Sequence, residues 1–433
     1  MRVSVRLLVG AVALCAGVTL AAGGGLRAEV DAVYPQMQAL YRDLHEHPEL
    51  STLETETAAK LAARLKELGY DVTTGIGGTG LVGVLKNGVG PTVALRVELD
   101  ALPVVENTGL PFASRVKTKD ASGAEVGVMH ACGHDAHMAA WVGTATVMAA
   151  NRKRWRGTLV LVGQPAEEVG VGAKAMMAGG LLTRFPKPDF ALAIHDDARR
   201  PAGEVGLASG PILTNADSLD VVVYGRGGHG ARPEATIDPV LIASRIVVTL
   251  QSIVAREQDP LDPAVITVGS IHGGTKYNII PDEVRLQLTV RSFNERTRSK
   301  LLAAIDRIAK AEAQAAGAEK LPTIKRTIVA EALSNDPALA ARLRPALTRD
   351  LGADQVKDAK PEMVSEDFTE WPLAGVPSVM MRIGAVNRTK YDAAVKNDTP
   401  LPSLHSSQFA PDAEPTIKGA IAAEVSALRE LLR

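Results

Sequence analysis

The sequence has few aromatic residues, few cysteines and almost no net charge. Tryptophan, tyrosine and phenylalanine together make up 3% of its 433 residues, whereas hydrophobic residues make up 46%. The core is therefore expected to be mainly aliphatic, and the length favours more than one domain. The formal net charge of −1 provides no basic excess to hold nucleic acid, so no nucleic-acid partner is expected.

Long hydrophobic runs are also scarce, and the one that stands out lies at the N-terminus. Residues 1–6 are basic (MRVSVR), residues 7–22 are apolar (LLVGAVALCAGVTLAA), and GGGLRA follows, ending in Ala28. This order is typical of a secretory signal peptide, and the apolar part is shorter than the ~20 residues of a spanning helix. An uncleaved anchor is the alternative. We expect residues 1–28 to be a signal peptide, the mature protein to be secreted or periplasmic, and no later segment to span a membrane.

Removal of that segment leaves a single cysteine. Cys15 lies inside it, and the other cysteine, Cys132, then has no disulfide partner, although disulfides are allowed in an exported protein. Cys132 lies within MHACGHDAH, residues 129–137, beside three histidines. This setting indicates a metal ligand or a nucleophile. A small buried apolar side chain is the alternative.

The spacing of apolar residues predicts an α/β fold. Near-continuous apolar runs alternate with segments of helical periodicity after residue 28, which is typical of a largely parallel sheet covered by helices. The pattern then changes to a strand, a helix, two alternating strands and another helix, a compact unit. We expect a larger domain, residues 29–213 and 327–433, interrupted by a smaller inserted α+β domain, residues 214–326.

Residues that can bind metal end three of the predicted strands. They are Asp100 in VELD, Glu167 and Glu168 in QPAEE, and His195 in AIHDD. In open α/β sheets, ligands bind at the carboxyl edge of the strands, so these residues and the segment around Cys132 are expected to meet there. The alternative is that strand ends are polar simply because they leave the core.

Eight segments together resemble the M20 family of metallopeptidases, and specifically its amidohydrolase branch, which includes hippurate hydrolases and auxin-conjugate hydrolases. They are LHEHPELS, ELDALPV, MHACGHDAH, GQPAEE, GGHGARPE, GGTKYNIIPDEV, SEDF and LHSSQF, in the order of the family and over nearly all of the chain after residue 28. The resemblance implies two adjacent divalent ions in the larger domain. It also implies that the smaller domain acts as a lid and as a dimerisation surface, and hence a homodimer.

The resemblance assigns roles to individual residues. It implies five metal ligands, namely Cys132, His134, Glu168, His195 and His405. Glu167 would be the general base. In the smaller domain, His229 would stabilise the oxyanion in the other subunit's site, and Asn278 would contact the substrate. From the sequence alone, Arg232 and Arg382 are candidates to pair with a substrate carboxylate, and surface ion pairs are the alternative.

The chemistry of the proposed ligands supports these roles. One thiolate, one carboxylate and three imidazoles suit a pair of divalent ions. The thiolate favours zinc, although manganese or cobalt would also be accepted. A metal pair activates water and polarises a carbonyl, and Glu167 would move the proton. Because neighbours on a strand face opposite ways, Glu167 and Glu168 require an irregular bend just after Pro165. Asp100 could hold the second nitrogen of a ligating imidazole.

Other positions are open to two interpretations or depart from the pattern. His130 and His137 could support the ligands or lie on the surface, and His45 favours structural packing over ligation. Glu98 stands where this branch usually has aspartate. DDARRPAG, which begins at Asp196, replaces the sequence that this branch usually has near the site, so the resemblance does not fix the substrate preference.

We therefore expect metal-dependent hydrolysis of the amide bond of N-acyl amino acids or small peptides. A dipeptidase or carboxypeptidase on the same scaffold is one alternative. A non-catalytic protein that binds amino acids or peptides is another, but the presence of Glu167 and all five ligands argues against it. A single structural metal site is the third, and it predicts one ion per chain without turnover.

Overall fold

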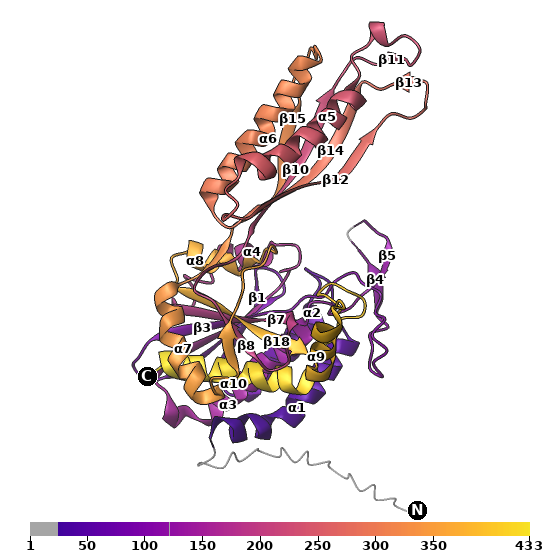
Figure 1. The fold of residues 1–433 in the computed structure, drawn as a ribbon. Helices are drawn as coiled ribbons and strands as arrows, with labels where there is room; N and C mark the ends of the chain where they lie inside the picture. Colours follow the sequence, from indigo (N-terminus) through magenta and orange to yellow (C-terminus); the bar gives the residue numbers. More distant parts are fainter. Residues whose placement is uncertain (1–24, 121) are drawn as a thin grey trace, which may run out of the picture.

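The computed structural model describes residues 25–120 and 122–433, which form a larger domain with a smaller domain projecting from it (Figure 1). Most of the expected signal peptide, residues 1–24, lies outside the described residues. Its last residues overlap the first helix, α1 (Leu26–Glu46).

An eight-stranded sheet forms the centre of the larger domain. Its strand order is β1 (Asp71–Ile76), β2 (Gly80–Asn87), β6 (Gly157–Gln164), β3 (Thr92–Glu98), β7 (Phe190–Pro201), β18 (Ser378–Val386), β8 (Val205–Leu207) and β17 (Val356–Asp358). The central strands β6, β3, β7 and β18 run parallel, whereas β1 and β2 pair antiparallel at one edge. The predicted α/β class with a mostly parallel sheet is confirmed.

Alternate residues of the central strands pack on opposite faces of this sheet. Leu159 and Leu161 of β6 join the core under five helices, whereas Val160 and Val162 join the core on the other face. The five helices are α1, α2 (Thr55–Glu67), α3 (His134–Ala150), α7 (Pro337–Leu351) and α10 (Ala413–Leu431). The shorter helices α4 (Gly172–Ala178) and α8 (Glu370–Leu373) contribute to the opposite face.

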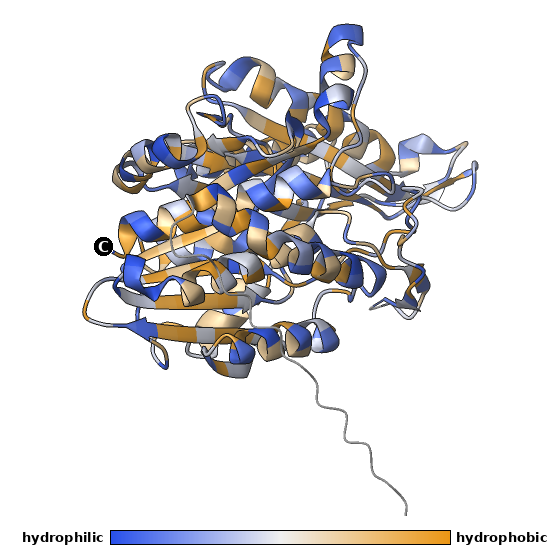
Figure 2. Cartoon of the chain, turned by 90° about the horizontal axis from the view of Figure 1, so that it is seen from below, coloured by the Kyte–Doolittle hydropathy of each residue, from blue (hydrophilic) through white to orange (hydrophobic). Residues whose placement is uncertain are grey.

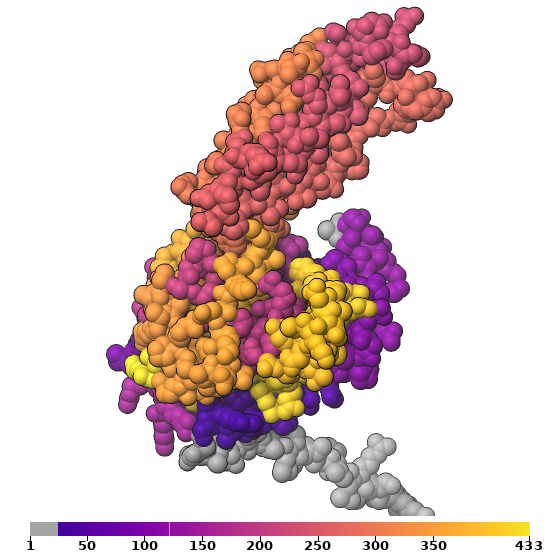
Figure 3. Space-filling model, in the orientation of Figure 1, coloured from indigo at the N-terminus to yellow at the C-terminus, as the bar shows by residue number. Residues whose placement is uncertain are grey.

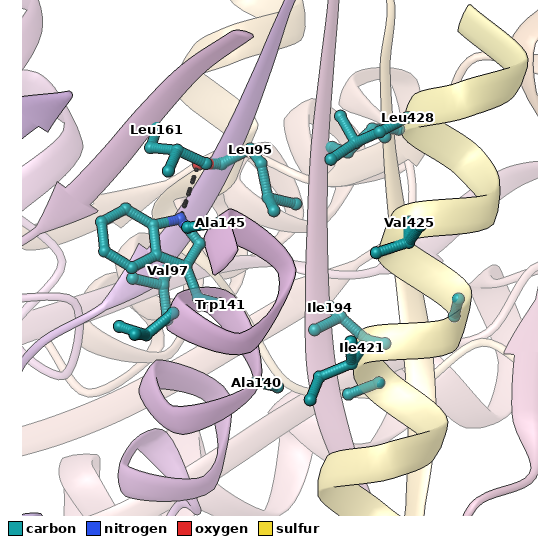
Figure 4. Close-up of a cluster of buried hydrophobic side chains, with 14 of the residues drawn as sticks. Leu95, Val97, Ala140, Trp141, Ala145, Leu161, Ile194, Ile421, Val425 and Leu428 are labelled. Atoms are coloured by element: carbon teal, nitrogen blue, oxygen red, sulfur yellow. Dashed lines mark hydrogen bonds between the residues drawn. The ribbon is translucent and has the colours of Figure 1, made fainter. Parts of the chain in front are cut away.

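Both cores are mainly aliphatic, and the strands of the large sheet are strongly hydrophobic (Figure 2). Trp141 is one of the few aromatic side chains in the core, and it lies between α3 and β3 (Figure 4). Its Nε1–H donates to the main-chain oxygen of Leu95 at 3.0 Å. This bond fixes α3, the helix that begins at His134, against the strand that leads to Asp100.

The smaller domain is a four-stranded antiparallel sheet with two helices on one face. Its strand order is β12 (Ala264–Gly273), β14 (Glu283–Ser292), β10 (Asn215–Tyr224) and β15 (Thr323–Ala330), and its helices are α5 (Pro239–Ser252) and α6 (Glu295–Ala315). The strand β15 was not part of the predicted pattern. It pairs with β10 as far as Ala330 opposite Ala216, so the inserted domain extends past the expected boundary at residue 326.

Shorter elements complete the described chain. They are the hairpin β4 (Lys117–Lys119) and β5 (Glu125–Gly127), the pair β9 (Gly210–Leu213) and β16 (Leu333–Asn335), the pair β11 (Gly228–His229) and β13 (Ile279–Ile280), and helix α9 (Arg388–Asn397). The pair β11 and β13 lies at the far tip of the smaller domain (Figure 1).

One helix in the described residues is long and apolar enough to cross a membrane, contrary to expectation. It is α5 with the π turn that follows, Pro239–Glu257, with a mean hydropathy of 1.4 over its most apolar stretch, of which 33% is buried. Ile242 and Ile246 pack in the core of the smaller domain, whereas Leu241 and Val248 are 58% and 72% exposed. The composition of α5 therefore reflects a buried face together with an exposed apolar face.

Candidate active site

Six residues singled out from the sequence lie together beyond the carboxyl ends of β3 and β6. Their donor atoms form overlapping groups, within 4.8 Å of one another in each, namely Cys132, His134 and His195; Cys132, Glu168 and His405; and His134, Glu167 and Glu168. We call these six residues the ligand cluster. The fold thus gathers the five candidate ligands and the candidate base from four separate parts of the chain.

The loop before α3 holds Cys132 and His134 on either side of a glycine. Gly133 has φ +80°, and a Cβ atom there would lie 2.2 Å from Asp196 Oδ2, so only glycine fits. His134 begins α3, and its Nδ1–H donates to the main-chain oxygen of Asp100 at 2.8 Å. When the ring is neutral, the other nitrogen, Nε2, therefore presents its lone pair to the cluster.

Glu167 and Glu168 follow β6 across a sharp bend. The strand ends at Gln164, and Ala166 then has φ +52°, a left-handed conformation that residues other than glycine rarely adopt. The Glu168 N–H donates to Asp100 Oδ2 at 3.0 Å, which fixes the chain after the bend. This is the irregular turn that the sequence requires for two adjacent carboxylates to face one site.

His195 and His405 come from β7 and from the loop after α9. His195 Nδ1–H donates to the main-chain oxygen of Asp196 at 3.0 Å, and its Nε2 lies 3.5 Å from Cys132 Sγ. His405 Nε2 lies 3.3 Å from Glu168 Oε2, and its side chain is 56% exposed. His405 therefore lies at the open side of the ligand cluster.

Two polar atoms of the cluster are buried without a hydrogen-bond partner among the described residues. They are His134 Nε2 and Glu168 Oε1. Burial of such atoms without a partner costs free energy, and both atoms can donate an electron pair to a cation. With one thiolate, one carboxylate and three imidazoles within reach, the residues fit a pair of divalent ions.

Burial makes the acidic groups of the ligand cluster hard to ionise. It raises the pKa of Glu168 to about 7, against the opposing effect of His134. Burial, together with the neighbouring Glu366, raises the pKa of Glu167 well above its usual value. Burial likewise raises the pKa of the Cys132 thiol. Divalent cations would oppose these shifts, because positive charge favours the ionised forms.

A buried arginine next to the ligand cluster was missed by the sequence interpretation. Arg96 of β3 donates to Glu366 Oε1 at 2.6 Å and to Asp367 Oδ1 at 2.9 Å, and it also contacts Glu98. Glu98 Oε2 in turn accepts from His137 Nδ1–H at 3.1 Å. Glu98 thus joins β3 to α3. An arginine within an apolar strand, and the paired acids of SEDF, were the available signals.

Three further histidines near the ligand cluster, His45, His130 and His137, are buried. His130 and His137 are buried, so the surface interpretation of both is wrong. His45 Nδ1 lies 2.6 Å from Asp135 Oδ2, and its Nε2 lies 3.0 Å from Glu106 Oε1. Burial alone would lower the pKa of His45, but these two hydrogen bonds outweigh burial and raise it to about 10.

His229, Arg232 and Asn278 do not lie with the ligand cluster. They lie at the tip of the smaller domain, around β11 and β13. The smaller domain projects away from the larger domain, so its tip is remote from it (Figure 3). The Gly230 N–H donates to the main-chain oxygen of Asn278 at 2.9 Å, which ties the tip together. His229 and Arg232 are exposed. A single chain in this arrangement therefore does not bring these three residues to the ligands.

A cleft of about 220 Å³ opens beside the ligand cluster. It is lined by five members of the cluster, all but His134, and also by Glu366 and Arg382. Side chains that can hold cations, with a further carboxylate in the same cleft that can act as a base, are the groups that a metal-dependent hydrolase uses. The geometry places the protein in that class.

Comparison with known proteins identifies the family. The family model described as Peptidase family M20/M25/M40 matches residues 94–404. Thermostable carboxypeptidase 1 of Saccharolobus solfataricus is 35% identical over 408 residues, which cover 93% of this chain and 98% of that protein. Hippurate hydrolase of Campylobacter jejuni is 37% identical over 336 residues, which cover 78% and 84%. The chain belongs to peptidase family M20, in its amidohydrolase branch.

A solved structure agrees with this assignment. The YXEP protein of Bacillus subtilis, described as a dinuclear metal binding peptidase from the M20 family, has a TM-score of 0.74 and 29% identity, and the match covers 92% of this chain and 98% of that one. The protein is therefore a hydrolytic enzyme, and metal-dependent hydrolysis of amide bonds is its general activity.

Proposed function

We propose that this enzyme cleaves the amide bond of N-acyl amino acids or small peptides and releases an amino acid, with Glu167 as the general base. The position of Glu167 carries the proposal. Its carboxylate lines the cleft within 4.8 Å of donor atoms of both His134 and Glu168. A general base needs this kind of reach to a water held at the ligands.

Cys132, His134, Glu168, His195 and His405 would hold two divalent ions, with zinc favoured by the thiolate and manganese or cobalt as alternatives. When bound, such ions polarise a carbonyl and lower the pKa of water toward neutrality.

Glu167 would take a proton from the attacking water and give it to the leaving amine. Burial and the nearby Glu366 raise its pKa, and a group that acts first as a base and then as an acid near neutral pH benefits from a raised pKa. Arg96 donates a hydrogen bond to Glu366 at 2.6 Å. This bond keeps the Glu366 carboxylate, which helps to raise the pKa of Glu167, in place.

The tip of the smaller domain would act on a second subunit. His229 would stabilise the oxyanion, and Asn278 and Arg232 would contact the substrate, in the site of the partner chain. The distance of the tip from its own ligand cluster (Figure 1) and the exposed apolar face of α5, with Leu241 and Val248, support a homodimer. The basic and apolar N-terminal sequence supports export, so we place the mature enzyme in the periplasm or outside the cell.

A dipeptidase or carboxypeptidase activity is the second candidate. It is favoured by the similarity to the Saccharolobus solfataricus carboxypeptidase, which extends over 93% of this chain. Both candidates require the same ligands and the same base, and they differ in which acyl group the site accepts.

The test is release of amine from N-acetyl amino acids, N-benzoyl amino acids and dipeptides, measured before and after chelation, with the metal counted per chain. Chelator-sensitive release from the N-acyl amino acids, with a pair of ions per chain, supports the proposal. Release from dipeptides alone supports the second candidate. Two ions without any release point to a binding protein, and one ion without release points to a structural metal site.

A further inference from the structure

The cleft beside the ligand cluster opens into a larger cleft. The first has a volume of about 220 Å³ and the second about 640 Å³, and three residues line both, namely Val364, Arg382 and Leu404. The larger cleft is bounded by α9 and the loop after it, and many of its lining side chains are apolar, including Tyr391 and Leu401. Arg382 is thus the charged residue at the passage between the ligand cluster and a largely apolar pocket.

The large sheet fixes Arg382 at this passage. In β18 it lies directly beside His195 of β7, in parallel register, and its side chain is only 6% exposed. The guanidinium group has therefore lost most of its contact with bulk water, although it lines a cleft. A buried cation in this position requires an anionic partner.

The carboxylate within ion-pair distance of Arg382 is shared with a second arginine. Glu362 Oε1 lies 3.4 Å from Arg382 Nη2, and Arg382 Nε has no hydrogen-bond partner among the described residues. The same oxygen of Glu362 lies 2.5 Å from Arg199 Nη2. Asp197 lies 3.7 Å from Arg199 Nε and 3.5 Å from Arg200 Nε. Arg382 and Arg199 therefore share the carboxylate of Glu362.

A guanidinium group with unused N–H donors matches the planar fork of a carboxylate. We propose that Arg382, supported by Arg199, binds a carboxylate of the substrate and thereby holds the amide bond beside Glu167. The larger cleft then receives the apolar group of the substrate. This inference rests on the proposed function and narrows it to N-acyl amino acids that carry a free carboxylate.

The segment that provides Arg199 supports this assignment. Arg199 lies in β7, the strand that also carries His195, and its side chain is 67% exposed and lines the larger cleft. The larger cleft thus carries an exposed arginine, Arg199, and a buried one, Arg382. Three carboxylates, those of Asp197, Glu362 and Asp398, line it as well.

The carboxylate could belong to the released amino acid or to the acyl group, and matched substrates separate these sources. The first pair is N-benzoylglycine and its methyl ester. The second pair is N-succinyl- and N-butyrylglycine methyl ester, in which only the acyl carboxylate differs. The substrate pair for which the wild-type enzyme prefers the free acid identifies the source.

The variants to compare are Arg382→Gln, Arg382→Lys and Arg199→Gln, with the metal counted in each. For Arg382→Gln we expect KM for the preferred acid to rise by about 10–100-fold, as for a lost hydrogen bond to a charged group, with a much smaller change in kcat. The ester should be affected little. Lysine should restore part of the loss, because it keeps the charge but not the fork. Arg199→Gln should have a smaller effect in the same direction.

Arg285→Gln is the matched control. Arg285 is exposed on the sheet of the smaller domain and pairs with Glu283 at 2.7 Å, so its loss should leave the acid-to-ester ratio unchanged. If Arg382→Gln loses metal or fails to fold, Arg199→Gln decides the question, because its side chain is exposed. An unchanged acid-to-ester ratio in every folded, metal-loaded variant would overturn the inference while leaving the proposed function intact.

Failure of the proposed function is distinguishable from failure of this inference. If the wild-type enzyme hydrolyses neither these substrates nor the wider set of N-acyl amino acids and dipeptides, the proposed function fails. Calorimetric binding of N-benzoylglycine and of its methyl ester to the wild-type and Arg382→Gln proteins then decides the inference without turnover. Tighter binding of the acid that is lost in the variant supports the carboxylate subsite, and equal binding of acid and ester overturns it.

Discussion

The ligand cluster and the tip of the smaller domain both present histidine and polar side chains, but in opposite surroundings. His134 and His195 are buried, and each is oriented by a bond from Nδ1 to a main-chain oxygen, at 2.8 and 3.0 Å. His229 at the tip is exposed, and its Nδ1 accepts from the Ala231 N–H two residues away, at 3.0 Å. The larger domain therefore orients its histidines through buried hydrogen bonds, whereas the tip leaves His229 exposed to solvent.

The largest effect on activity is expected from removing the proposed base, Glu167, from the ligand cluster. Glu167→Gln should lower kcat/KM for amide hydrolysis by about 10²–10⁴-fold, the contribution of a positioned general base. The metal content should not change. Glu168→Gln is the matched control, because it should lose metal as well as activity. Steady-state rates with metal analysis of both variants check this, and substantial activity in a metal-loaded Glu167→Gln enzyme would exclude Glu167 as the base.

The next effect concerns the tip. His229→Ala should lower kcat by about 10²–10³-fold, as for loss of an oxyanion donor. Because His229 is exposed, the melting temperature and the metal content should stay at wild-type values. An unchanged kcat would show that His229 at the tip takes no part in the reaction.

Mixing two inactive variants sharpens the comparison between the regions. His229→Ala and Glu167→Gln subunits, unfolded and refolded together, should regain about a quarter of wild-type activity if each site takes its histidine from the partner, because half of the dimers are mixed and each has one complete site. No recovery in a mixture shown to contain mixed dimers would mean that the tip serves its own chain.

A smaller effect on activity is expected from a substitution that weakens metal binding. Cys132→Ser replaces the soft ligand of the cluster, and metal affinity should fall by at least the roughly 10–100-fold that loss of a supporting hydrogen bond costs a metal site. The exposed His272 in the smaller domain provides the control His272→Gln, with unchanged metal binding. Competition with a chelator measures both. Equal metal affinity in the wild-type and Cys132→Ser proteins would show that Cys132 acts as a buried apolar residue and not as a metal ligand.

The smallest effect on activity, and a clear effect on stability, is expected at His45. The pKa of His45 is raised to about 10 from about 6.5 in the unfolded chain, so its ion pairs stabilise the fold fully below pH 6.5 and lose this effect as the pH rises through 10. His45→Gln should cost about 1.5–3 kcal/mol at pH 6, as for hydrogen bonds to a charged group, and less at pH 10.

Denaturant unfolding at both pH values measures this difference. The exposed His47 gives the control His47→Gln, which should leave stability within about 0.5 kcal/mol of wild type. A cost of His45→Gln that does not shrink between pH 6 and pH 10 would show that His45 is neutral in the fold.

The gathering of five of the six members of the ligand cluster, all but His405, could be predicted from sequence, because each lies within or next to a recognisable helix or strand. Glu167 and Glu168 follow an apolar strand, and His195 lies within another, so a parallel sheet brings them to one edge. For both carboxylates to face one site, the sequence required a bend just after Pro165, and Ala166 has the corresponding left-handed conformation. The roles of these residues remain predictions, because placement alone does not show which atom moves a proton.

The rest could not be predicted, because it depends on contacts between distant segments. Arg96 is an isolated charge in an apolar strand, and its partners Glu366 and Asp367 lie 270 and 271 residues away. The edge strand β15 lacks a clear alternation of buried and exposed residues, so its pairing with β10 was hidden. The exposed apolar face of α5 resembles a membrane span in composition, since hydropathy does not record which side of a helix is covered.

The way in which the smaller domain joins the larger one gives it independence during folding. The strands β9 and β16 pair antiparallel on either side of the insertion, with Leu213 opposite Leu333, and the next residues continue as the pair β10 and β15. The whole inserted domain therefore occupies the position of a hairpin turn. Its two ends lie about one strand spacing apart, ~5 Å, so closing this very long loop needs no strain in the larger domain, and either domain could change in size without shifting the register of the other.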